Sequence, residues 1–167
     1  MTVYRGPPLP YGPISLIEPD HDEVVDALHG ADLTEHQKGW FERARWDNGC
    51  YYFSLQHQGS VAGQMILHDI DWEAKEAMVG YHLFRSENRG RGLGSAALKA
   101  LCQYAFGRLG LRRLTAITSY DNVASHRIPA KAGFREVGAA REGPNLVVYE
   151  QRAEEAGVLV DSQVQLT

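Results

Sequence analysis

The feature that most constrains this chain is a glycine-rich turn, Ser86–Leu98, that joins a strand pattern to a helix pattern. The residues before it, Ala77–Phe84, are almost all apolar or aromatic and predict a strand. The apolar residues after it recur at helical spacing and predict an amphipathic helix to about Arg108. The first N–H groups of a helix have no partner within the helix, and the helix dipole favours negative charge there. Because glycines let a ligand approach the backbone closely, this arrangement predicts an anion site, most simply for phosphate.

The spacing of the glycines argues against two common nucleotide sites. A Walker loop needs Gly-Lys-Ser/Thr at the start of the helix, whereas here Gly94 is followed by Ser95 and Ala96. The dinucleotide fingerprint needs G-x-G-x-x-G, whereas the glycines of this turn are Gly90, Gly92 and Gly94. The turn is therefore expected to bind a phosphate group of another class of ligand.

Composition indicates one soluble globular domain. The chain has 167 residues, 44% of them apolar and 23% charged, which is enough to bury a core. The net charge of −4 argues against nucleic acid as a partner but leaves room for basic or amine-bearing substrates. No apolar run approaches the length of a membrane span, and the first residues do not resemble a signal peptide. We therefore expect a cytoplasmic protein that does not associate with membranes, with Cys50 and Cys102 reduced.

A domain is predicted over residues 1–152, with the proline-rich residues 1–13 as a loose lead-in and residues 153–167 as a C-terminal tail. No repeat, linker or second domain is evident in the sequence. The patterns predict, in order, a strand at 14–17, a helix opening at 19–22, a second helix from Thr34 to about Arg45, strands at 51–55, 61–67 and 77–84, the helix after the turn, a strand at 111–118, a helix from Asn122 to about Ala132, and strands at 134–137 and 146–150.

Two motifs resemble one enzyme superfamily. Arg89-x-x-Gly92-x-Gly94 resembles the pyrophosphate motif of the GNAT superfamily of acyl-coenzyme A N-acyltransferases. The segment Asn122–Phe134 is similar to the N-x-x-S-x-R-x-x-x-K-x-G-F signature of its ribosomal-protein N-terminal acetyltransferase-like (RimJ/RimL-type) branch. The predicted element order is also that of the GNAT fold, over roughly Ile14–Arg152. The resemblance implies a single α/β domain with a mixed sheet of about seven strands, splayed between the fourth and fifth, and about four helices.

The resemblance implies that acetyl-coenzyme A lies where these two strands splay apart. Backbone groups of Leu83 and Arg85 would pair with the pantetheine arm like an added strand. The N–H groups of residues 89–95 would hold the pyrophosphate, and the amide of Asn122 would hydrogen-bond the pantetheine. The cofactor-binding residues that it implies are Leu83, Phe84, Arg85, Arg89, Gly90, Arg91, Gly92, Leu93, Gly94, Ser95, Asn122, Ser125 and Arg127.

The catalytic residues are less clearly marked. Many superfamily members have a tyrosine seven residues after the asparagine as the donor to the departing thiolate, and here that position is Pro129. Ser125 is then the expected donor, the alternative being a hydroxyl that bonds back to a helix carbonyl. Some relatives carry a glutamate where this chain has Met78, so the base stays open. His82 is the candidate, although histidines in apolar strands are more often core residues. His126 is expected to point elsewhere.

The sequence predicts an N-acetyltransferase in which an amine attacks the thioester directly. The expected acceptor is a protein or peptide N-terminus. The alternatives are a small amine (polyamine, amino-acid derivative or antibiotic) and a coenzyme A-binding regulatory domain without catalysis. The seven histidines have no metal-ligating spacing, so no metal is expected, and a homodimer stays open. Tyr149 would face the cleft or the core. One cluster would attract a cationic amine or be a solvated turn: His68, Asp69, Asp71, Glu73 and Glu76.

Overall fold

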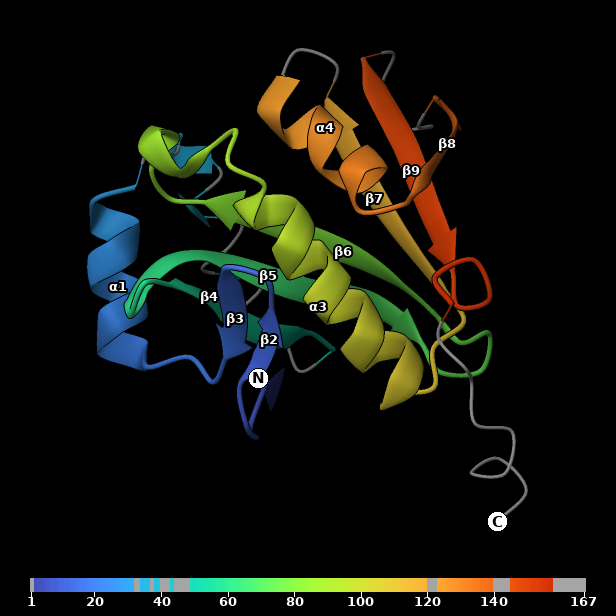
Figure 1. Cartoon of the computed structure of the whole chain (residues 1–167), viewed down its shortest axis with the longest axis horizontal. Coiled ribbons are helices and arrows are strands. Elements are labelled where there is room, and N and C mark those ends of the chain that lie inside the picture. The colour runs from blue at the N-terminus through green and yellow to red at the C-terminus, as the bar shows by residue number, and fades with distance from the viewer. Residues whose placement is uncertain are drawn as a thin grey trace.

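The computed structural model describes residues 2–31, 34–36, 38–39, 43, 49–119, 123–139 and 145–157. Residues 2, 86 and 123–125 are described by their backbone alone. Within these ranges, nine strands form a single mixed sheet, and the three helices that are described over their whole length, α1 (His21–His29), α3 (Leu93–Gly107) and α4 (Val123–Lys131), pack against it (Figure 1). None of the helices in the described ranges combines the length and the apolar character that a membrane crossing requires.

The elements follow the predicted order. The sheet order is β2-β3-β4-β5-β6-β7-β9-β8, with β1 paired to β4. Neighbouring strands are antiparallel except in the β1–β4 and β6–β7 pairs. The strands are β1 (Thr2–Val3), β2 (Leu9–Tyr11), β3 (Ile14–Ile17), β4 (Tyr51–His57), β5 (Ser60–Asp71), β6 (Glu76–Leu83), β7 (Arg113–Ser119), β8 (Arg135–Ala139) and β9 (Leu146–Arg152), and the helices are α1 (His21–His29), α3 (Leu93–Gly107) and α4 (Val123–Lys131), with a 3-10 turn, η1 (Ser86–Asn88), before α3.

The predicted second helix is described only in part. Residues 35–36, 38–39 and 43 are helical, and the N–H of Lys38 donates to the carbonyl of Thr34 at 3.0 Å. Thr34 thus lies one turn before Lys38, as the sequence predicts for the start of this helix. The other residues of the predicted helix, including Trp40 and Phe41, lie outside the described ranges.

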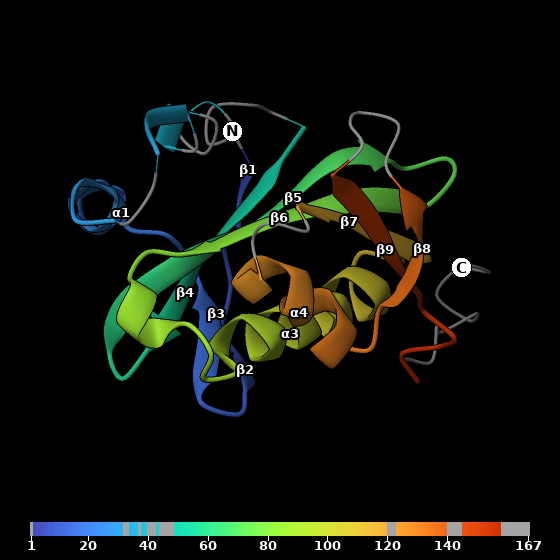
Figure 2. The same ribbon diagram turned by 90° about the horizontal axis from the view of Figure 1, so that it is seen from above.

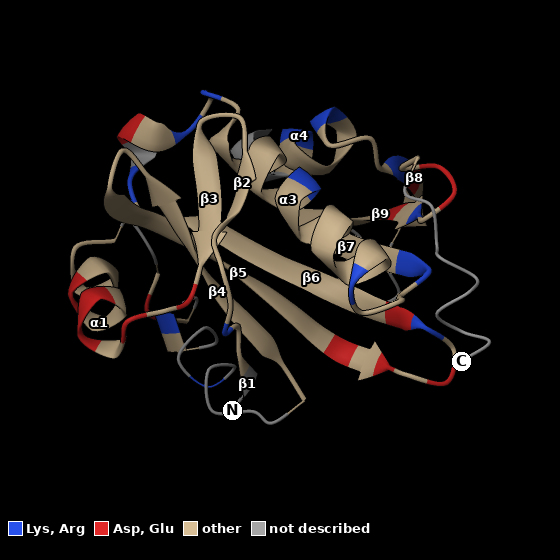
Figure 3. Cartoon of the chain, turned by 60° about the horizontal axis from the view of Figure 1, so that its bottom comes forward, with Lys and Arg blue, Asp and Glu red and all other residues tan. Residues whose placement is uncertain are grey.

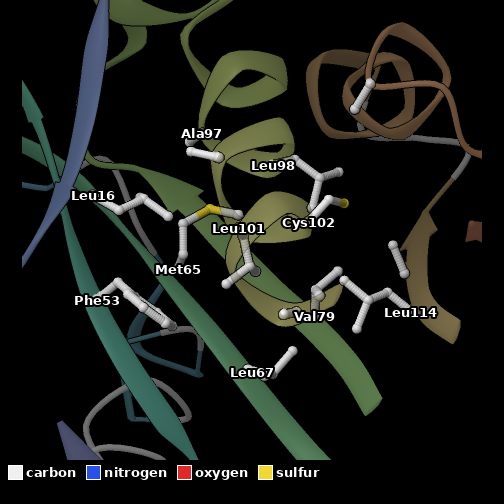
Figure 4. Close-up of a cluster of buried hydrophobic side chains, with 14 of the residues drawn as sticks. Leu16, Phe53, Met65, Leu67, Val79, Ala97, Leu98, Leu101, Cys102 and Leu114 are labelled. Carbon is white, nitrogen blue, oxygen red and sulfur yellow. The ribbon is translucent and has the colours of Figure 1, made fainter. Parts of the chain in front are cut away.

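The sheet has a helix layer on each face. α3 and α4 cover one face and α1 covers the other (Figure 2). Because side chains alternate along a strand, Phe53 and Met65 point toward α3, whereas Tyr52 and Ile66 point toward α1. The larger core lies between α3 and the sheet, where it includes Leu101 (Figure 4). This core determines where the N-terminus of α3 lies.

The first thirteen residues depart from the prediction of a loose lead-in. They contribute β1 and β2 to the sheet, which explains why the sheet has nine strands rather than about seven. The physical reason is Tyr4, which is buried, stacks on Phe53 and donates its hydroxyl to the carbonyl of Pro7. The prolines are compatible with a strand here because β2 lies at the sheet edge, where an N–H is not needed for pairing.

The sheet opens between the two neighbouring strands β6 and β7, as predicted. Their parallel pairing runs from Glu76 with Arg113 to Val79 with Ala116 and ends there. On its other side, β6 stays paired to β5 as far as Leu83. The carboxyl-terminal half of β6 therefore borders an opening in the sheet, which is where ligands bind in open α/β sheets.

One glycine on β5 lets β6 follow this path. A Cβ atom placed on Gly63 would overlap the carbonyl oxygen of His82 and approach the Cα atom of Leu83 to 3.3 Å. Those atoms are backbone, so they cannot move aside without shifting the end of β6. Gly63 is therefore needed for the close approach of two strands beside the opening.

We predict that Gly63→Ala lowers the free energy of unfolding by about 1–3 kcal/mol because of this overlap. Urea or thermal unfolding measures the loss. Gly30→Ala is the control, since a Cβ atom there comes no closer than 4.0 Å to the nearest atom, the carbonyl oxygen of Ala27. Equal stability of the two variants would contradict the proposed close approach.

Candidate functional site

A cavity of about 430 Å³ lies between the turn before α3, the end of β6 and the α4 helix. It borders the opening between β6 and β7, because Leu83 at the end of β6 is one of its walls. The residues that line it are Leu83, Arg89, Gly90, Gly92, Leu93, Gly94, Ser95, Arg127, Ile128 and Lys131. Eight of these ten belong to the cofactor-binding set that the family resemblance implies, and the other two are Ile128 and Lys131.

Two glycines of the turn have a left-handed backbone. Gly90 and Gly92 have φ values of 76° and 79°, in the left-handed region that disfavours other residues. Gly92 is the N-cap of α3, with no side-chain hydrogen bond at the cap. The first N–H groups of α3 therefore face the cavity without a capping side chain, as an anion site requires.

A second glycine brings α4 close to α3. A Cβ atom on Gly94 would lie only 2.5 Å from Cδ1 of Ile128, so the absence of a side chain there allows the two helices to approach. The hydroxyl of Ser95 donates to the carbonyl of Ile128 at 3.2 Å and ties the helices together. The Ser95 side chain thus has a structural role, while its backbone N–H belongs to the first turn of α3.

Three cations border this cavity. They are Arg89 from the turn and Arg127 and Lys131 from α4, and no carboxylate lies among the lining residues. Figure 3 shows basic residues on the turn and on α4 and acidic residues at the far end of β5. Lys131 was not among the residues predicted from sequence. Its spacing of four from Arg127 in a helix would have placed it on the same face and so indicated it.

Arg89 links the cavity to the end of β6. Its guanidinium donates to the carbonyl of Leu83 at 3.3 Å and lies 3.2 Å from Nε2 of His82. A guanidinium has no acceptor, so in a hydrogen bond between these two groups Nε2 of His82 is the acceptor. His82 is half-buried at the rim of the opening and contacts a residue that lines the cavity.

Other predicted cofactor residues lie away from the lining of the cavity. The Arg85 side chain is exposed and forms an ion pair with Glu87 at 3.7 Å. Phe84 is buried in the core beneath α1, and its N–H donates to the carbonyl of Ala62 at 2.9 Å. Arg91 is exposed and does not line the cavity.

Two further predicted residues cannot be placed at the level of side chains. Asn122 lies outside the described ranges, and Ser125 is described only by its backbone, in the first turn of α4. α4 runs through Pro129 and ends before Gly133, which has a φ of 92°. The N–H of Phe134 then donates to the carbonyl of Pro129 at 2.9 Å and terminates the helix.

Tyr149 faces the helix layer. It is buried, and its hydroxyl lies 3.2 Å from Nδ1 of His126 on α4. Burial raises the pKa of Tyr149, and the charge of Glu136 adds to the rise. The hydroxyl thus stays protonated at neutral pH, and His126 is directed toward β9.

The acidic cluster lies beside a second cavity, of about 690 Å³, near the β5–β6 turn. Three of its carboxylates, those of Asp69, Asp71 and Glu76, have partners in the described structure. Asp71 accepts from the N–H groups of Glu73 and Ala74, and Asp69 pairs with His68 at 2.5 Å. Glu76 forms an ion pair with Arg113, which also contacts Glu150, a buried carboxylate at the same cavity. These pairs reduce the attraction that the cluster offers to a cation.

The residues at the first cavity fit a diphosphate ester. A left-handed glycine turn, the N-terminus of a helix and three cations supply donors and positive charge, and Leu83, Leu93 and Ile128 supply apolar wall. Among the described residues, no three His, Cys, Asp or Glu side chains lie close enough together to hold a metal ion.

The amino-acid sequence of this chain is similar to those of known acetyltransferases. The profile of the family described as "Acetyltransferase (GNAT) domain" matches residues 17–135. "Putative ribosomal N-acetyltransferase YdaF" of Bacillus subtilis (strain 168) is 36% identical over 89 residues, 53% of this chain and 48% of that protein. "Probable N-acetyltransferase YjcK" of the same organism is 38% identical over 112 residues, 66% of this chain and 59% of that protein. The chain thus spans about half to three fifths of the length of these relatives.

Solved structures share the fold over most of this chain. RimL, a ribosomal L7/L12 alpha-N-protein acetyltransferase in complex with coenzyme A, superposes with a TM-score of 0.70 at 17% identity, covering 87% of this chain and 98% of that one. A spermidine N-acetyltransferase SpeG chimera from Vibrio cholerae and hSSAT superposes with a TM-score of 0.71 at 13% identity, with the same coverage. Identities this low establish a common fold and nothing narrower.

We predict that Gly92→Val abolishes binding of coenzyme A, because a β-branched residue at this left-handed position would distort the turn and add bulk beside the cavity. Isothermal titration calorimetry measures the loss. The matched control is Gly59→Val in the β4–β5 turn, where φ is 80° and a Cβ atom likewise meets nothing within 4 Å. Undiminished affinity in Gly92→Val would rule out the turn as the phosphate site. An equal loss in the control would assign the effect to general strain.

Proposed function

Because the chain belongs to the acetyltransferase (GNAT) domain family, we propose that it transfers the acetyl group of acetyl-coenzyme A to a primary amine. The observation that carries this proposal is the cavity formed by the glycine turn and three cations at the opening between β6 and β7. Diphosphate binding at one end would direct the rest of the cofactor along the strand edge that β7 leaves unpaired.

In this proposal the cations hold the cofactor and the strand edge orients it. Arg127, Lys131 and the N-terminus of α3 would bind the pyrophosphate. Backbone groups of Gly80–Leu83, which face away from β5, would pair with the amides of the pantetheine arm. A backbone N–H of this edge would polarise the thioester carbonyl as negative charge develops on its oxygen.

His82 is the proposed base. In the structure its Nε2 atom is engaged by Arg89, whose guanidinium is also bound to the carbonyl of Leu83. A pyrophosphate is a stronger partner for a guanidinium than an imidazole or a carbonyl is. Cofactor binding would thus draw Arg89 toward the cavity and leave Nε2 of His82 to accept a proton from the incoming amine.

Ser125 is the proposed proton donor to the departing thiolate. Its position in the first turn of α4 places it two residues before Arg127, a residue of the cavity. The reaction would then form the C–N bond of an amide and break the C–S bond of the thioester. The proton lost by the amine would pass to His82, and the thiolate would receive one from the Ser125 hydroxyl. Exchange with solvent water would then remove the proton from His82 and return one to Ser125.

The proposed acceptor is a protein or peptide N-terminal amine. The ion pairs and hydrogen bonds of the acidic cluster support this choice, because a polycation would have to compete with Arg113 and with backbone N–H groups for the same carboxylates. The name of the YdaF relative is in keeping with it. A small polyamine is the second candidate, favoured by the four carboxylates that line the larger cavity: Asp69, Asp71, Glu76 and Glu150.

The test is thiol release from acetyl-coenzyme A with a panel of acceptors comprising N-terminal peptides, polyamines, amino acids and aminoglycosides. Both cysteines are buried, and burial raises the pKa of the Cys102 thiol, so the protein contributes little background to a thiol reagent. Turnover with peptides alone supports the proposed acceptor. Turnover with polyamines alone would replace it. Binding of acetyl-coenzyme A without turnover on any acceptor would indicate a regulatory domain.

We predict that His82→Gln lowers kcat about a hundred-fold or more, because the amine would lose its proton acceptor. Steady-state kinetics measures the loss, with His29→Gln at the exposed end of α1 as the control. An unchanged kcat would exclude His82 as the base.

Ser125→Ala should likewise lower kcat while calorimetry finds the affinity for acetyl-coenzyme A unaltered.

A further inference from the structure

We propose that Gln64 recognises the first peptide group of the acceptor and so selects peptides over polyamines. This assignment rests on the proposed function, because it places the acceptor amine beside His82. It concerns the face of the sheet opposite α3 and α4. Neither sequence motif predicts a site on that face.

Three polar side chains form a row across neighbouring strands on this face. In the sheet register, Ser54 on β4 is directly opposite Gln64 on β5, which in turn is directly opposite His82 on β6. Residues paired in this way have their Cβ atoms about 4.5–5.5 Å apart and point to the same side of the sheet. The row therefore runs from the interior of the sheet to the histidine at the rim of the opening.

The middle of this row carries hydrogen-bonding capacity that the described structure does not use. Gln64 is 1% exposed, and neither its Oε1 nor its Nε2 atom has a hydrogen-bond partner within the described ranges. The hydroxyl of Ser54, which is also 1% exposed, likewise has no hydrogen-bond partner within the described ranges. Buried polar groups in proteins are almost always satisfied, so this amide and hydroxyl need a partner beyond the residues described, and we assign the acceptor to that role.

The location matches the reach of a peptide acceptor. Neighbouring strands lie about 4.8 Å apart, so Gln64 is one strand spacing from His82. In a peptide, the first peptide group begins within one residue of the N-terminal amine, a span of about 3.8 Å between successive Cα atoms. With the amine at His82, the first peptide group would therefore lie over Gln64.

The chemistry of the side chain selects the class of acceptor. A glutamine amide offers one acceptor oxygen and two N–H donors, so it can accept from a peptide N–H and donate to a peptide carbonyl at once. A polyamine carries donors only and would leave the Nε2 donors of Gln64 unpaired in a buried site. Sites of this kind reject ligands that lack the matching group.

The test compares the best peptide acceptor of the panel with an analogue methylated on its first peptide nitrogen, in wild type and in Gln64→Met. We expect Gln64→Met to lower kcat/KM for the peptide about ten-fold or more, mainly through KM. N-methylation should lower kcat/KM in wild type but not in Gln64→Met, because the contact that it removes is already lost there. Gln103→Met, on the exposed face of α3, is the control and should behave as wild type.

Thermal unfolding provides a second readout that needs no acceptor. Because methionine is similar in shape to glutamine and has no amide to satisfy, Gln64→Met should keep or raise the melting temperature. A clear fall in melting temperature would mean that Gln64 has a structural role instead.

The outcomes separate this assignment from the proposed function. Wild-type protein that acetylates no peptide would overturn both. Wild-type protein that acetylates the peptide and its N-methylated analogue equally well would overturn the Gln64 assignment alone, and this comparison does not depend on any variant folding. The same holds if Gln64→Met acetylates the peptide as efficiently as wild type.

Discussion

The structure depends on the parallel pairing of β6 and β7, which covers only the first half of β6. β6 and β7 are parallel and paired as far as Val79 and Ala116, and beyond that point this edge of β6 is no longer paired to β7. The separation is maintained from both sides. Gly63 lets β5 hold the end of β6 closely, and β7 is paired along its whole length to β9. An opening of this kind exposes the hydrogen-bonding groups of a strand edge inside a domain. The other strand pairs of the sheet stay intact.

The helix layers convert this opening into a site with two sides. The core between α3 and the sheet holds the N-terminus of α3 at the end of β6, and Gly94 lets α4 approach with its two cations. The face beneath α1 instead carries Ser54, Gln64 and His82. Under the proposed function, the cationic side would bind the diphosphate and the polar side would bind the acceptor, so the acetyl group would pass between the two faces of the sheet. Arg89 contacts both sides and couples them.

Much of this arrangement could be predicted from consecutive residues. The strand, the glycines and the helix start were predicted in this order from consecutive residues, and the structure has them there, with Gly90 and Gly92 at positive φ. The alternation and spacing of apolar residues predicted the order of the elements after residue 13. Residues 1–13 were different, because their prolines indicated a loop, whereas the burial of Tyr4 against Phe53 draws them into the sheet.

By itself, then, the sequence determined the local elements: the strand, the glycine-rich turn, the start of the helix, and the family motif that they carry. Only the tertiary structure decided which polar and charged side chains lie next to one another. It paired the acidic residues of the β5–β6 turn with Arg113 and backbone N–H groups, brought Lys131 to the cavity, and aligned Gln64 with His82 across two strands. The physical reason is range. A φ angle or an unpaired helix N–H depends on adjacent residues, whereas an ion pair or a cross-strand register depends on residues that only folding brings together.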